Sequence, residues 1–146
     1  MKDWFTAKIK YLKQDPENGT IKKVSEVFLL NALSHTEAEA RLQSILEEFI
    51  PEYELLKLDK SNFNQVIIDK SKDYFFKLRI SSVYAAEEEE NNSTQSEVYI
   101  VQAESSKDAI AKLEVFLHLS VAEWEVKSVL KTQIIEAFPY IETEVD

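Results

Sequence analysis

The sequence predicts an α+β protein formed by tandem duplication of a ββαβ unit, with one helix covering each antiparallel sheet. Three observations support this prediction: the chain repeats itself at a constant offset, its apolar residues alternate as in strands, and each copy holds one segment of helical spacing. We expect the copies to span residues 1–71 and 72–146. We also expect them to form one compact pseudo-two-fold pair, either within one sheet or as two stacked sheets.

The internal repeat is clearest where residues 25–32 align with residues 96–103, at an offset of 71 positions. Identical residues recur at this offset without a gap: Phe5 and Phe76, Ile9 and Ile80, Ser34 and Ser105, Ala38 and Ala109, Leu42 and Leu113, Leu46 and Leu117. Because one register is kept from strand to helix to strand, we interpret the chain as a duplication.

The first copy begins with a strand over residues 5–11, where apolar and polar side chains alternate. A polar turn at residues 15–19 leads into a second strand over residues 24–32. This second strand is apolar at both odd and even positions, a pattern that is typical of burial on both faces. Residues 53–58 and 66–68 have the composition of two further strands.

The predicted helix of the first copy starts at a capping box formed by Ser34 and Glu37 and stops before Pro51. Helical spacing places one apolar stripe on it: Ala38, Leu42, Ile45, Leu46 and Phe49. We expect this stripe to pack on the sheet.

The second copy repeats this plan, with strands over residues 76–83, 95–103 and 124–130 and an acidic loop over residues 85–94. Ser105 and Asp108 cap its helix. The expected apolar stripe comprises Ala109, Leu113, Phe116 and Leu117. Residues 134–138 match the short fourth strand of the first copy.

Composition excludes several classes of function. The 146 residues contain no Cys, which excludes a disulfide scaffold and thiolate metal sites, and one Gly, which excludes a glycine-rich phosphate loop. The net charge of −10 disfavours a general DNA-coating protein. Since no export signal or membrane-spanning apolar stretch is visible, we expect a cytoplasmic protein with no membrane partner.

The sequence resembles a domain-of-unknown-function family of small proteins from Bacteroidota and their phages. The resemblance lies in the aromatic-led first strand at Trp4 and Phe5, the segments 25–32 and 34–40, and the Phe-Pro-Tyr at residues 138–140. It covers nearly the whole chain and implies a bacterial or phage origin, with a role in replication, transcription or host takeover. It implies no activity, cofactor or catalytic residue.

Catalytic motifs are absent from the sequence. His35 and His118 do not correspond under the repeat and have no metal-ligand spacing, and Ser34 is explained by helix capping. We therefore expect a non-enzymatic protein without cofactor or metal.

We expect this protein to bind a protein partner, or a second copy of itself, through sheet edges or faces. Trp4 is the expected aromatic contact, and the acidic run Glu87, Glu88, Glu89 and Glu90 is a second candidate surface. The alternative is an accessory nucleic-acid-binding protein that uses Lys8, Lys10 and Arg79, because Lys8 and Arg79 recur in register.

Overall fold

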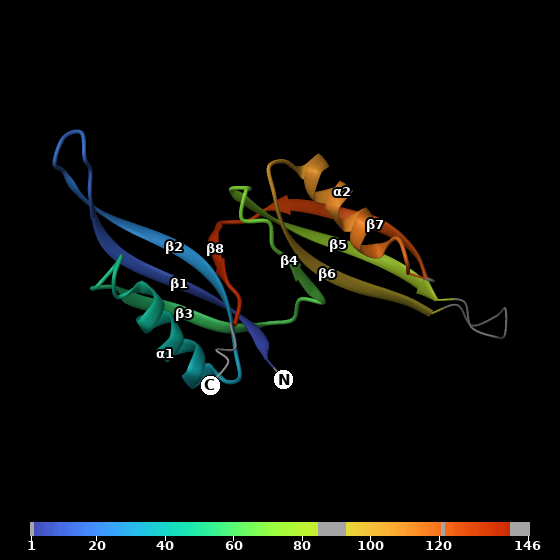
Figure 1. Cartoon of the computed structure of the whole chain (residues 1–146), viewed down its shortest axis with the longest axis horizontal. Coiled ribbons are helices and arrows are strands. Elements are labelled where there is room, and N and C mark those ends of the chain that lie inside the picture. Colours follow the sequence, from blue (N-terminus) through green and yellow to red (C-terminus); the bar gives the residue numbers. More distant parts are fainter. Residues whose placement is uncertain (1, 85–92, 121, 141–146) are drawn as a thin grey trace, which may run out of the picture. The chain divides into compact units, whose positions relative to one another are not determined.

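The structure is a computed structural model that describes residues 2–84, 93–120 and 122–140. It divides into two compact units. Unit 1 combines the chain up to Ser61 with the segment that starts at Ile134, and unit 2 comprises Asn62–Gln133. Each unit is a four-stranded sheet with one helix packed on it (Figure 1), which confirms the predicted α+β class and the ββαβ plan.

Unit 1 contains strands β1 (Asp3–Gln14), β2 (Ile21–Ala32), β3 (Glu54–Ser61) and β8 (Ile134–Phe138), and helix α1 (His35–Leu46). The strand order is β3-β1-β2-β8. Strand β1 pairs antiparallel with β2 and β3, whereas β8 runs parallel to β2.

Unit 2 contains strands β4 (Gln65–Ile67), β5 (Tyr74–Tyr84), β6 (Ser93–Ala103) and β7 (Glu123–Lys131), and helix α2 (Ser106–Leu117). Its order, β4-β6-β5-β7, is that of unit 1 at the repeat offset, and β4 is again parallel to its neighbour. Even the strand irregularity recurs, between Lys8 and Ile9 in unit 1 and between Arg79 and Ile80 in unit 2.

The two short parallel strands are exchanged between the copies. Strand β4 lies near the end of the first copy but joins the sheet of unit 2, and β8 lies near the end of the second copy but joins the sheet of unit 1. Each sheet therefore takes its fourth strand from the other copy.

The core of each unit lies between the sheet and its helix. In unit 1, Phe5, Ala7 and Ile9 of β1 face Ala38, Leu42 and Leu46 of α1, and their equivalents line unit 2. Ser34 and Ser105 accept hydrogen bonds of 3.1 Å from the backbone N–H of Glu37 and Asp108. The predicted capping boxes are thus present, and each stabilises its helix start by about 1 kcal/mol.

Two side chains of the predicted helix stripes lie outside the core. Phe49 is 78% exposed because α1 ends at Leu46, and two backbone bonds to the Leu46 carbonyl turn the chain outward before Pro51. Phe116 is 48% exposed and lies edge-on to Tyr99, beside the buried stripe rather than in it. The prediction that both belong to the core is wrong.

Candidate functional site

The sheet face of unit 1 that α1 does not cover carries Trp4, Lys8 and Lys10. They occupy alternate positions of β1, because the intervening residues point into the core. Lys8 is exposed, whereas Trp4 and Lys10 are half-buried. These three side chains therefore share the sheet face opposite α1, and their role in binding stays a prediction.

Arg79 occupies the position on β5 that Lys8 occupies on β1. It lies between the buried residues Leu78 and Ile80 and is exposed on the sheet face opposite α2. It has no ion pair with a described residue. The acidic run at Glu87–Glu90 falls outside the described residues.

Another repeated basic position has a structural role. Arg41 of α1 donates hydrogen bonds to the carbonyl oxygens of Asn31 and Pro139 and lies over the ring of Tyr140. Its equivalent Lys112 donates to the carbonyl oxygen of Gln102 at 3.0 Å and to the carboxylate of Asp69, just after β4, at 2.8 Å. Because these cations hold the segment that follows each exchanged strand, they are not available to bind a partner.

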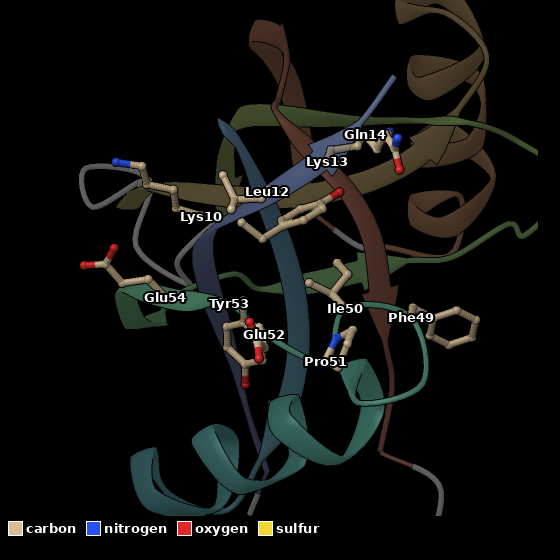
Figure 2. A pocket seen from close by; sticks show the side chains of 11 residues that line it. Lys10, Leu12, Lys13, Gln14, Phe49, Ile50, Pro51, Glu52, Tyr53 and Glu54 are labelled. Carbon is tan, nitrogen blue, oxygen red and sulfur yellow. The ribbon is translucent and has the colours of Figure 1, made fainter. Parts of the chain in front are cut away.

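A hollow of about 880 Å³ opens in unit 1 where β1 extends beyond its neighbour β3. Strand β3 pairs with β1 only as far as Lys10, while β2 continues alongside β1 to Gln14. Figure 2 shows Leu12 and Lys13 of β1 on one side of the hollow, and Phe49, Ile50 and Pro51 of the segment after α1 on the other side. The hollow is lined by residues 10–14 and 49–54.

Apolar side chains dominate the rim of this hollow. Phe49 is 78% exposed, and Ile50 and Pro51 lie beside it in Figure 2. Exposed apolar side chains that surround a concavity are typical of a binding site for another macromolecule.

Two tyrosines of the hollow are held in their neutral form. Burial and a 2.5 Å hydrogen bond donated to the Glu26 carboxylate raise the pKa of Tyr11 to about 12. Burial, together with the charge of Glu39, also raises the pKa of Tyr53. Because both phenols stay protonated at neutral pH, neither supplies a base or a nucleophile, and the wall offers an uncharged aromatic surface.

The side chains that line the hollow are not repeated in the second copy. The repeat aligns Tyr11, Lys13, Phe49 and Pro51 with Ser82, Tyr84, Ser120 and Ala122. The core residues match between the copies, whereas the side chains of the hollow do not. The fold alone therefore does not require these side chains, which leaves binding as a reason for them.

The histidines occupy structural positions. The His35 ring lies 3.1 Å from the Leu58 carbonyl oxygen, and the His118 ring lies 2.7 Å from that of Val115. In the described part of the chain no three His, Asp or Glu side chains gather to hold a metal ion.

The fold and the hollow define a duplicated α+β protein with an apolar hollow in unit 1. The chain belongs to the family described as "Domain of unknown function (DUF4494)", whose family model matches residues 3–140. No match was found among the curated proteins or among the solved structures. Among the helices that the structure describes, none has the length and apolar character that crossing a membrane requires.

Sequence reasoning missed the hollow because it assigned Phe49 to the helix stripe. Phe49 does fall at helical spacing, but Pro51 disfavours helical geometry at Ile50, so the helix ends a turn earlier. The sequence signal that could have indicated the hollow is Phe49 itself, which stands only two positions before the helix-breaking Pro51.

Proposed function

We propose that this chain is a non-enzymatic interaction protein of bacterial or phage origin that binds a protein partner in the cytoplasm, in replication, transcription or host takeover. The observation that carries the proposal is the hollow of unit 1, with Phe49 exposed at its rim. An aromatic side chain that is solvated in the free protein gains the most from burial in an interface.

The sheet edges are less suited to a partner than the hollow. Edge strands β3 and β7 each carry an irregularity and lysines, including Lys57 and Lys127. The other two edge strands, β4 and β8, are only three and five residues long. Bulges and charged side chains are the usual protection of an edge against added strands. We therefore assign partner binding to the hollow and not to strand addition.

Photocrosslinking tests this proposal. Full-length protein carrying benzoylphenylalanine in place of Phe49 is mixed with nuclease-treated lysate of the source organism and irradiated. We expect a defined protein adduct at position 49 that is competed by unlabelled wild-type chain. The matched control carries the photoprobe in place of Leu119, which is 82% exposed in unit 2. Equal adducts at both positions, or none at position 49, would refute the proposal.

A second candidate is direct nucleic-acid binding, favoured by the exposed pair Lys8 and Arg79 on the uncovered faces of the two sheets. In that case the affinity for single-stranded DNA should fall steeply with salt, and Lys8→Glu with Arg79→Glu should weaken it further. Binding that resists salt, or that is unchanged in this variant, excludes the candidate.

A further inference from the structure

The hairpin formed by β1 and β2, whose first strand lines the hollow, concentrates positive charge in a protein with a net charge of −10. Five of its lysines make no ion pair with a described residue: Lys8, Lys10, Lys13, Lys22 and Lys23. Outside the hairpin, Lys57, Lys60 and Lys112 each have a carboxylate within 3.4 Å, whereas Lys70 and Lys107 make no ion pair with a described residue. The hairpin therefore gathers several cations without a carboxylate partner on two adjacent strands.

Lys13 and Lys22 stand directly opposite each other on β1 and β2. They share the sheet face of Tyr11, which is the face turned to the hollow, and both are exposed. Like charges at directly paired positions destabilise a hairpin. The second copy has no such pair, because the repeat aligns these residues with Tyr84 and Ser93.

Two glutamates line the hollow, Glu52 and Glu54, but neither forms an ion pair with Lys13 or Lys22. Glu54 stands opposite Lys10 in the β1–β3 register, so its charge lies beside Lys10, three residues before Lys13. The Asp15 carboxylate accepts a 2.8 Å hydrogen bond from the backbone N–H of Glu17 and so stabilises its own turn. Lys13 also lines a second, smaller hollow of about 220 Å³ together with Lys22 and Val24.

We propose that the partner segment bound here is an acidic peptide with an aromatic or aliphatic side chain. Its carboxylates lie against Lys13 and Lys22, and its apolar side chain enters the hollow beside Phe49 and Pro51. This inference rests on the proposed function and names the chemistry of the partner. The apolar rim favours a peptide over a nucleic acid, whose backbone would use the lysines but leave the hollow walls unfilled.

Selection from a displayed library of random 16-residue peptides tests the inference on the full-length protein. The variant Lys13→Glu/Lys22→Glu serves for counter-selection. We expect enriched peptides to combine Asp or Glu with an aromatic or aliphatic residue. No enrichment, or enrichment of peptides without acidic residues, would overturn the inference.

The affinity of the best enriched peptide is then measured by fluorescence polarisation. We expect at least about a tenfold loss in Lys13→Glu/Lys22→Glu, a smaller loss in Lys13→Gln/Lys22→Gln, and about a fivefold loss in Phe49→Ala. All substituted side chains are exposed, so the variants should fold normally.

Matched controls separate this site from general electrostatics. Lys70→Glu/Lys107→Glu makes the same change in net charge at exposed positions of unit 2, and Leu119→Ala removes an equally exposed apolar side chain. Both should leave the affinity unchanged. Equal losses in the controls, or displacement of the peptide by single-stranded DNA at lower concentration, contradict the inference. A different outcome separates the two proposals. If a partner forms the adduct at position 49 but binds the lysine variants as tightly as wild type, this inference is refuted and the proposed function stands.

Discussion

The phenol of Tyr11 couples the hairpin to the wall of the hollow. It donates a 2.5 Å hydrogen bond to the Glu26 carboxylate on the neighbouring strand, and its ring packs against the unit 1 core. Because the bond requires the protonated phenol, burial and Glu26 together raise the pKa of Tyr11 to about 12. The fold therefore favours the neutral side chain.

Tyr11→Phe removes this hydrogen bond and should lower the free energy of unfolding by about 1 kcal/mol at neutral pH. A raised pKa in the folded state gives stability that is full below the ordinary tyrosine value of 10.0 and is lost as the pH rises through about 12. The difference in unfolding free energy between wild type and Tyr11→Phe should thus be constant from pH 7 to pH 9 and smaller at pH 11. Urea unfolding followed by circular dichroism measures it.

Tyr74→Phe is the matched control for this prediction. Tyr74 is 43% exposed, and its ring contact with Lys131 does not need the hydroxyl group. We expect no change in the unfolding free energy at any of these pH values. A Tyr11→Phe difference that grew with pH would contradict the assigned protonation state.

Core residues were predictable from the sequence, whereas the residues of the hollow were not. Phe5, Ala7 and Ile9 are buried as alternation requires, since a strand on a covered sheet leaves each side chain only two environments. Phe49 has the same spacing relative to the helix stripe but lies past the last helical turn. Its exposure depends on where the helix stops, which local spacing does not determine.

At the scale of elements, a charged side chain of each helix holds the segment that follows the exchanged strand. Lys112 lies 2.8 Å from an Asp69 oxygen and 3.2 Å from Asp108. The hydrogen bond that Lys112 donates to the Asp69 carboxylate, together with those donated by Ser71, holds the pKa of Asp69 well below its usual range. The Asp69 backbone N–H also donates to the Gln102 side chain at 3.0 Å.

Lys112→Met should destabilise unit 2, because it removes the cation and keeps the aliphatic stem. A lowered folded-state pKa gives stability that is present above the ordinary aspartate value of 3.8 and is lost as the pH falls from there through the folded-state pKa. The decrease in unfolding free energy caused by Lys112→Met should therefore be larger at pH 7 than at pH 3. Chemical unfolding at the two pH values checks this, with the exposed Lys107→Met on the same helix as control.

Short-range signals explain which elements were predictable. The serine caps, the helices and the long strands are encoded by neighbouring residues, and they lie where the sequence predicts them to within a few positions. The exchange of β4 and β8 is not encoded in this way. A strand of three to five residues has the same local pattern whichever of two equivalent sheets it joins.

At the scale of the whole molecule, the exchange makes each unit depend on residues from the other copy. Phe138 of β8 packs on the unit 1 core, with its ring centroid 5.8 Å from that of Phe28. Its repeat equivalent, Ile67 of β4, packs on the unit 2 core. The two tryptophans report on the units separately, since Trp4 belongs to unit 1 and Trp124 to unit 2.

Because the short strands are exchanged, a substitution in β8 should destabilise unit 1, although β8 belongs to the second copy. A substitution in β4, which belongs to the first copy, should destabilise unit 2. Phe138→Ala, at the end of the second copy, should lower the stability of unit 1 by about 2 kcal/mol, and Ile67→Ala should lower that of unit 2 by a similar amount. Urea unfolding is followed by fluorescence in Trp124→Phe and Trp4→Phe backgrounds, which isolate the signals of units 1 and 2. Phe138→Ala should move the Trp4 transition and Ile67→Ala the Trp124 transition.

The reverse assignment would show that each short strand stays with its own copy, and identical shifts of both signals would show that the two units unfold as one.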